Sequence, residues 1–210
     1  MHLQQRIEKP DPALRERTDW KYSLLIAVLC VVGVRLFLTV LLAGVAIYLP
    51  CPELRDRYAV TGVEMIDAGW ERVLLGVWQR EDAIWYQKIA TVGYSTEDMT
   101  SQLFPLFPMA MKAVSGATGL HPIAAGIVVS EISLLAALFL LHRLILPRYG
   151  VGVANRTLVY IALFPISFFL HGLFSESLAL LLAILSFFLV AKSRWIEAVA
   201  IGYLAGLSRP

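Results

Sequence analysis

The segment that begins at Asp82 combines a carboxylate with aromatic side chains, and this combination suits general-base chemistry. On a helix, Asp82 lies over Trp85 and Tyr86, which follow it at positions i+3 and i+4. Partial desolvation beside such an apolar surface can raise the pKa of a carboxylate toward the range in which it accepts a proton from a hydroxyl. The alternative, which the sequence leaves open, is that Asp82 only caps the helix.

A second set of polar residues lies in the segment HGLFSES, residues 171–177. Ser175 is a natural N-cap, and Glu176 in the first helical turn suits the helix dipole, so a purely local role is sufficient. The functional hypothesis is that Glu176 and His171 face Asp82 at the outer boundary of a membrane. Arg209 approaches the same face if its helix runs outward, and a guanidinium can bind a phosphate with two hydrogen bonds.

Two further charges, Arg35 and Glu131, each lie near the middle of a long apolar run. An unpaired ion at the centre of a bilayer costs about 2.5–3.5 kcal/mol on insertion scales. We therefore expect Arg35 and Glu131 to form a structural pair that fixes the packing of two membrane spans. The alternatives are that one of them lines a polar path for an ion or a lipid phosphate, or that each has another partner.

The elements that position these residues follow from the composition. The chain has 210 residues, of which 58% are hydrophobic and 16% charged, and its mean hydropathy is +0.69. A soluble domain is typically about 45–50% apolar and 25% charged, so the sequence predicts an all-α, polytopic bundle of transmembrane helices. A net charge of +2 gives no reason to expect nucleic acid as a partner. Two cysteines make no disulfide framework, and no Cys/His spacing indicates a metal site.

The apolar runs and the charges between them predict the topology. Basic residues cluster in a predicted loop, 142–156, and at Lys192 and Arg194, which places those segments and the N-terminal tail, 1–22, in the cytoplasm. The large loop 50–122 is then outside and carries interfacial helices; one of them, at 103–120, could instead be a short, kinked span. The predicted spans of this membrane domain, 23–210, are 23–49, 123–141, 157–173, 177–193 and 195–208. The last span ends without a polar tail, so we expect the chain to be the N-terminal portion of a longer protein.

Four segments resemble one family in the same order along the chain. Residues 82–94 are similar to its WDAxxYxxIAxxGY segment, and 104–108 to its PLFP element. Residues 164–178 resemble its FPxSFF…YSESL segment, and GLSRP, 206–210, resembles the arginine-containing segment that closes the next span. The family is PIG-V, the GPI mannosyltransferase 2 family, whose members are GT-C membrane glycosyltransferases.

This resemblance implies an inverting transfer of a hexose, by analogy mannose, from a polyprenyl- or dolichyl-phosphate sugar to a lipid or glycan acceptor. Asp82 is then the catalytic base, and Arg209 with His171 stabilises the departing lipid phosphate. Glu176 orients the acceptor or the sugar. Trp85 and Tyr86 stack on the sugar or anchor the helix in the membrane. No resident cofactor is implied, and a need for a divalent metal stays open.

Two other classes of function remain. A secondary transporter would use the intramembrane charges Arg35 and Glu131, and a non-catalytic membrane subunit would need no site at all. A transporter needs its polar residues along a path through the membrane, whereas an enzyme needs them gathered at one face. The expected location is the plasma membrane of a bacterium or the endoplasmic reticulum of a eukaryote.

Overall fold

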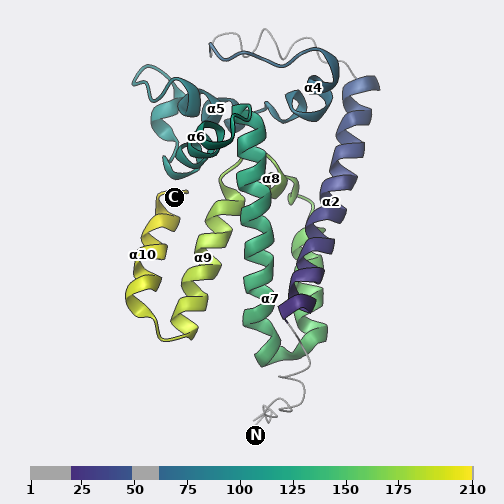
Figure 1. Cartoon of the computed structure of the whole chain (residues 1–210), viewed down its shortest axis with the longest axis vertical. Coiled ribbons are helices and arrows are strands. Elements are labelled where there is room, and N and C mark those ends of the chain that lie inside the picture. Colours follow the sequence, from purple (N-terminus) through teal and green to yellow (C-terminus); the bar gives the residue numbers. More distant parts are fainter. Residues whose placement is uncertain (1–19, 49–61, 210) are drawn as a thin grey trace, which may run out of the picture.

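A computed structural model describes residues 20–48 and 62–209, so most of the predicted cytoplasmic tail and the first part of the predicted outer loop lie outside the described residues. Within these ranges the chain forms helices and no strand, and the all-α prediction is confirmed for them. The helices separate into long, apolar ones that run together and short ones that gather at one end (Figure 1).

Over the described residues, two helices are long and apolar enough to cross a membrane: α2 (Trp20–Tyr48), with 29 residues, and α7 (Pro122–Ala162), with 41. At about 1.5 Å per residue, α2 exceeds the roughly 30 Å thickness of a bilayer core. Two shorter apolar helices, α9 (Glu176–Ala191) and α10 (Trp195–Gly206), pack against each other, and α9 packs against α7. Figure 1 shows these helices running along one common direction.

The helix α7 changes direction at Gly150. This residue has φ +80° and ψ 169°, values that no helix contains and that glycine tolerates because it lacks a Cβ. Residues on both sides of it are helical, whereas the sequence placed a loop over 142–156. Hydropathy detects where a helix leaves an apolar environment, but the basic residues of this segment are also good helix formers. After Ala162 a turn leads into the single-turn helix α8 (Phe168–His171).

The short helices form a unit that we call the head region, residues 62–121. It contains α4 (Gly69–Leu74), the 3₁₀ helix η2 (Gly76–Trp78), α5 (Asp82–Thr91), the 3₁₀ helix η3 (Met99–Gln102) and α6 (Leu106–Thr118). Figure 1 shows α4, α5 and α6 at the end of the bundle where α7 begins. The backbone N–H of Leu106 donates to the carbonyl of Leu207 at 3.1 Å, so the head region also contacts the end of α10.

Buried apolar residues form two clusters, one beneath the head region and one further along the long helices. The first cluster includes Trp78, Tyr86, Phe107, Met111 and Leu173, which come from the head region and from the segment before α9. The second joins α2 to both segments of α7 and includes Ala27, Val31, Leu134, Leu138 and Leu158. The first cluster therefore holds the head region on the bundle and fixes the orientation of α5.

Large apolar side chains also point outward from α2 and α10. Phe37 and Val40 on α2, and Ile196 and Val199 on α10, are each at least 65% exposed. A soluble protein rarely exposes continuous apolar surface on this scale, whereas lipid accommodates it. These faces and the lengths of α2 and α7 indicate a membrane protein.

Candidate functional site

Asp82 is the first residue of α5, and its side chain is exposed. The preceding residue, Glu81, takes the N-cap position and makes no capping hydrogen bond with its side chain. Its φ of +49° is unusual for a residue with a Cβ, and such strain is concentrated at functional sites. Among the described residues, the side chain of Asp82 has no hydrogen bond or ion pair, so its carboxylate is available to another molecule.

Tyr86, one turn after Asp82, connects α5 to the start of α9. Its hydroxyl donates a hydrogen bond of 3.1 Å to Oγ of Ser175, and both side chains are buried. The ring packs edge-on against Phe107 of α6, with 5.1 Å between the ring centroids. Ser175 occupies the N-cap of α9 but makes no capping hydrogen bond with its side chain; it binds Tyr86 instead.

Glu176, the first residue of α9, forms an ion pair and hydrogen bond with Arg209, which follows α10. The Glu176 side chain is 25% exposed and that of Arg209 is 52% exposed. The pair is therefore open to the surroundings on the side of the guanidinium. Hydrogen bonds from the backbone hold this end of the chain in place, because the N–H groups of Ser208 and Arg209 both donate to the carbonyl of Ala205.

The charges of these residues converge on the phenol of Tyr86. Burial raises the pKa of Tyr86, and the negative charges of Glu176 and Asp82 raise it further. The hydrogen bond with Ser175 and the positive charge of Arg209 act in the opposite direction. The charges of Asp82, Glu176 and Arg209 therefore all act on the same phenol. We call these residues the Asp82 cluster: Asp82, Tyr86, Ser175, Glu176 and Arg209.

Arg35 and Glu131 form a separate group deeper in the bundle. Nη1 of Arg35 lies 3.1 Å from Oε1 of Glu131 and donates a 2.8 Å hydrogen bond to the carbonyl oxygen of His171. The guanidinium also lies over the ring of Trp78, at 4.7 Å from the centroid. The structure thus joins α2 to α7 through the two charges that the sequence placed in the middle of apolar runs.

His171 belongs to this deeper group and not to the Asp82 cluster, which differs from the expectation that it faces Asp82. Its Nδ1 lies 3.0 Å from Oε1 of Glu131, and the side chain is only 1% exposed. The physical reason is that α8 ends at His171 and the chain then turns through Gly172. The side chain therefore points back into the bundle, while Ser175 and Glu176 lie beyond the turn.

Comparison with known proteins gives one result. The family model for Mannosyltransferase (PIG-V) matches residues 21–209. The chain belongs to this mannosyltransferase family. No curated protein and no solved structure matches it. The family match supports a glycosyltransferase that uses a sugar donor and an acceptor, and with the two long apolar helices it indicates a membrane enzyme.

In this member of the PIG-V family, the two aromatic candidates on α5, Trp85 and Tyr86, lie in different surroundings. Tyr86 lies in the Asp82 cluster, whereas Trp85 is half-buried and has the Nζ of Lys88 5.8 Å from its ring centroid. Lys88 also pairs with Asp98 at 2.8 Å, which ties α5 to the turn before η3. Trp85 therefore contacts the lysine of its own helix that makes the ion pair with the neighbouring loop.

Sequence reasoning missed the buried amide that holds the head region of this family member together. Nε2 of Gln79 donates to the carbonyl of Glu64 and to Oε1 of Gln87, both at 2.9 Å. Oε1 of Gln79 accepts the N–H of Ile66 at 2.8 Å. Nothing in the sequence distinguishes a buried glutamine from an exposed one. The only available signal was that Gln79 lies three residues before Asp82.

Over 20–48 and 62–209, no three His, Cys, Asp or Glu side chains lie close enough together to hold a metal ion. In the Asp82 cluster, Glu176 pairs with Arg209 and the phenol of Tyr86 binds Ser175, while the carboxylate of Asp82 has no such partner among the described residues. The chemistry that this arrangement can perform is proton abstraction by a carboxylate and binding of an anion by Arg209.

Proposed function

We propose that this chain transfers mannose from a polyprenyl- or dolichyl-phosphate donor to a hydroxyl of a lipid or glycan acceptor, as an inverting glycosyltransferase of the GT-C type. Family membership supports mannose and sugar transfer. The observation that carries the mechanism is Asp82, an exposed carboxylate without a hydrogen-bonding or ionic partner among the described residues, whose charge acts on Tyr86 together with those of the Glu176–Arg209 pair.

The reaction is a single displacement in this proposal. The carboxylate of Asp82 takes the proton of the acceptor hydroxyl while the hydroxyl oxygen forms a bond to the anomeric carbon of the sugar. The bond between that carbon and the phosphate oxygen breaks, and the lipid phosphate leaves with the electron pair, so the anomeric configuration is inverted. Arg209 binds the departing phosphate, whose negative charge grows as the bond breaks.

Glu176 has a positioning role in this proposal. Its ion pair with Arg209 holds the guanidinium near Tyr86 and near the start of α5. A phosphate that binds Arg209 shares the guanidinium with Glu176 or displaces that carboxylate. Glu176 is then free to accept a hydrogen bond from the sugar or from the acceptor, which is the role that the resemblance implies.

The side of the membrane on which the reaction takes place is also part of the proposal. Arg143, Arg148 and Arg156 lie on the two arms of α7 around Gly150. Figure 1 shows this turn at the end of the bundle opposite the head region. Basic segments remain in the cytoplasm, which supports a cytoplasmic turn and N-terminus and an outer, extracytoplasmic or luminal, head region. We infer a multi-pass protein in which α9 and α10 complete the membrane domain.

The test is an assay of mannose transfer in native-like membranes. The membranes contain the protein in its natural full-length form and receive radiolabelled polyprenyl-phosphate mannose, and label is followed into lipid and glycan products. Asp82→Asn keeps the size of the side chain but removes the base, and it should lower transfer by about 10²–10⁴-fold. Glu97→Gln is the matched control, because Glu97 is an exposed carboxylate elsewhere in the head region. Equal transfer by wild type and Asp82→Asn, at equal expression, would refute Asp82 as the base.

A further inference from the structure

The buried side chain of His171 takes no direct part in the sugar transfer described above, yet it lies on the segment that leads to Glu176. Only 1% of this side chain is exposed, so the imidazole is closed off from a sugar phosphate at the Asp82 cluster. A buried residue that touches no substrate still affects a reaction when it fixes the backbone that carries a reacting group. The contacts of His171 identify the groups involved.

Two hydrogen bonds hold His171, one through its ring and one through its backbone. Nδ1 of the ring lies 3.0 Å from Oε1 of Glu131. The carboxylate of an ion pair only accepts hydrogen bonds, so Nδ1 carries the proton in this contact. The carbonyl oxygen of His171 accepts a 2.8 Å hydrogen bond from Nη1 of Arg35, and the same Nη1 donates to Glu131 at 3.1 Å. One ion pair therefore fixes both the side chain and the backbone of His171.

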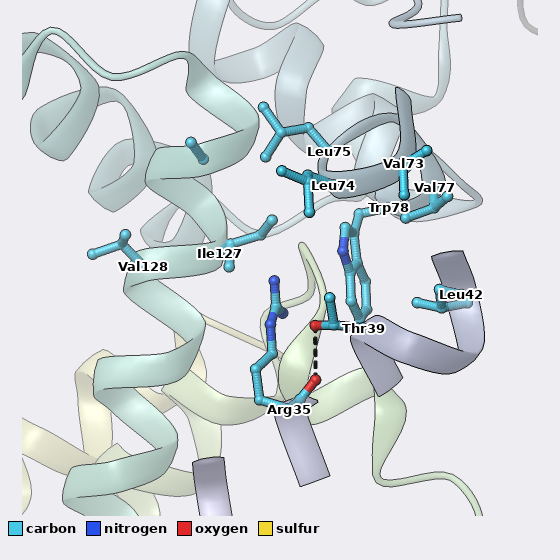
Figure 2. A pocket seen from close by; sticks show the side chains of 11 residues that line it. Arg35, Thr39, Leu42, Val73, Leu74, Leu75, Val77, Trp78, Ile127 and Val128 are labelled. Atoms are coloured by element: carbon cyan, nitrogen blue, oxygen red, sulfur yellow. Dashed lines mark hydrogen bonds between the residues drawn. The ribbon is translucent and has the colours of Figure 1, made fainter. Parts of the chain in front are cut away.

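The guanidinium of Arg35 also contacts the segment that leads to Asp82. It lies 4.7 Å from the centroid of the Trp78 ring, and Figure 2 shows the two side chains next to each other. Trp78 ends the 3₁₀ helix η2, four residues before Asp82. The ring is confined on another side by Gly172, where a Cβ would lie only 3.2 Å from the indole. The segments that lead to Asp82 and to Glu176 therefore meet at Arg35.

The surroundings of Arg35 offer its guanidinium few other acceptors. Arg35 lies beside a cavity of about 270 Å³ between α2, α7 and the segment from α4 to η2. Apart from Arg35, Thr39 and Trp78, the lining of this cavity is aliphatic (Figure 2). The hydroxyl of Thr39 donates to the backbone of its own helix. Loss of a hydrogen bond to a charged group in such surroundings is costly, so the bonds with Glu131 and with the carbonyl of His171 persist.

We propose that His171, held by Glu131 and Arg35, is a positioning residue for sugar transfer. Its ring and its carbonyl fix the turn that follows it, and this turn sets the start of α9 relative to Asp82. The proposal rests on the proposed function, because it assigns a role in that reaction. It departs from the role that the resemblance implies, in which His171 itself stabilises the departing phosphate. Because a misplacement of about 1 Å can lower a rate about 10²-fold, the effect belongs to kcat.

Two substitutions of His171 test this role in the assay of mannose transfer. His171→Asn keeps a donor at the place of Nδ1, because the side-chain amide of asparagine carries an N–H there, whereas His171→Leu keeps the bulk without a donor. We expect His171→Leu to lower kcat by about 10–100-fold while KM stays within about twofold of the wild-type value. His171→Asn should retain kcat within about threefold, since the contact with Glu131 is preserved.

His142→Leu is the matched control for the loss of a buried, hydrogen-bonded histidine. His142 on α7 is fully buried, and its two ring nitrogens lie 3.0 Å from Oγ of Ser23 and 2.9 Å from Oδ1 of Asn155. Ser23 belongs to the first turns of α2, and Asn155 lies beyond the break of α7 at Gly150, so this contact is remote from the head region. His142→Leu should lower the melting temperature, while kcat measured below that temperature stays at the wild-type value.

A double variant covers the case in which His171→Leu fails to fold. Arg35→Met combined with Glu131→Leu removes the donor to the carbonyl of His171 without leaving one buried charge alone. A purely structural ion pair predicts full activity of the folded double variant. The positioning role predicts that kcat falls by at least about tenfold.

A distance measurement tests the positioning without the reaction. Nitroxide labels are attached at Thr91→Cys after α5 and at Phe187→Cys on α9, since both residues are exposed, in a protein that also carries Cys30→Ser and Cys51→Ser. Pulsed electron paramagnetic resonance then reports the distance between the two helices. We expect one narrow distribution in the otherwise wild-type protein and in His171→Asn, and a broader or shifted one in His171→Leu. Identical distributions in all three would overturn the positioning role.

The outcomes of the assay separate this proposal from the proposed function. Asp82→Asn tests the base whatever the role of His171. If wild type transfers mannose and folded His171→Leu keeps the wild-type kcat, the positioning role is wrong while the enzyme assignment stands. If His171→Asn loses as much kcat as His171→Leu, the imidazole itself acts in the reaction, and the positioning role is again refuted. If wild type transfers no mannose, the proposed function fails, and the role of His171 in transfer fails with it.

Discussion

The hydroxyl of Tyr86 donates a 3.1 Å hydrogen bond to Oγ of Ser175, and these residues lie 89 positions apart in the sequence. Tyr86 is one turn after Asp82, and Ser175 immediately precedes Glu176. The bond therefore sets the distance between the proposed base on α5 and the ion pair at the start of α9. Because burial raises the pKa of Tyr86, the phenol remains a neutral donor well above neutral pH.

We expect Tyr86→Phe to lower kcat for mannose transfer more than it raises KM. The variant keeps the ring contact with Phe107 but removes the donor, and a net hydrogen bond contributes about 0.5–1.5 kcal/mol. Ser175→Ala should have a similar effect, and the double variant should be no worse than either single variant, since one bond connects them. Tyr203→Phe, at an exposed position on α10, is the control. Additive losses would show that the two side chains act separately.

Arg209→Gln should reduce transfer strongly while hardly changing stability. The ion pair with Glu176 is partly exposed, and exposed pairs contribute about 0–1 kcal/mol. A role in binding the lipid phosphate predicts a much larger effect on kcat/KM. The exchange Glu176→Arg with Arg209→Glu restores the pair in reverse and tests this directly. If the exchanged protein regains activity, Arg209 is structural and does not bind phosphate.

The ion pair between Arg35 and Glu131 predicts that a single variant loses more stability than the double variant. Arg35→Met leaves Glu131 and His171 without their cation, and removing one partner of a buried pair typically costs about 3–5 kcal/mol. Arg35→Met combined with Glu131→Leu removes both charges and should unfold at a temperature closer to that of wild type. Thermal unfolding in detergent measures both. A double variant less stable than Arg35→Met alone would contradict this account.

The backbone at Gly172 lies so close to two aromatic rings that only glycine fits there without displacing them. A Cβ at this position would lie 2.7 Å from the ring of Phe174 and 3.2 Å from Trp78. Gly172→Ala must therefore displace buried aromatic rings, at a cost of about 1–3 kcal/mol, and it should also lower activity because residues 173–176 shift. Gly206→Ala is the matched control, since no neighbouring atom lies within 4 Å of a Cβ there. Unchanged melting temperature and activity in Gly172→Ala would show that the rings move freely.

The contact between α5 and the loop before η3 predicts a pH dependence. Hydrogen bonds from Lys88 and Thr100 lower the pKa of Asp98 from 3.8 to about 2. Because the pKa in the folded state lies below that in the unfolded state, the stabilisation is complete above pH 4 and is lost as the pH falls toward 2. The difference in unfolding free energy between wild type and Asp98→Asn should be constant above pH 5 and should shrink below pH 4. A constant difference down to pH 2 would contradict the lowered pKa.

The sequence predicted the helical class and several boundaries because these depend on local patterns. The apolar run after the N-terminal tail predicted a span at 23–49, and α2 covers Trp20–Tyr48. Two prolines and a lysine within 103–120 predicted a short interfacial helix; the helix α6 is present at Leu106–Thr118 in the head region, and its place at a membrane interface stays a prediction. The continuous helix before Gly150 was missed, because charged residues end an apolar run without ending a helix.

The site was only partly predictable, because its geometry depends on contacts between distant segments. The association of Glu176 with Arg209 follows from helices that run together, and the sequence placed both residues on one side. The place of His171 depends on the length of α8 and on the turn at Gly172, which no sequence pattern specifies. The contacts of Gln79 and of Tyr86 with Ser175 appear only after the head region has packed on the bundle.

Two contacts connect the end of α10 to earlier segments of the chain, and they have a consequence for biosynthesis. One is the backbone hydrogen bond between Leu106 and Leu207, and the other is the ion pair between Glu176 and Arg209. A ribosome adds about 5–20 residues per second, so Ser175 emerges roughly 4–18 s after its partner Tyr86. Arg209 follows another 33 positions after Glu176. During that interval the nascent chain exposes Asp82 without its cationic neighbour. In the proposed function, the site is therefore complete only after Arg209 has been synthesised and α10 has packed against α9.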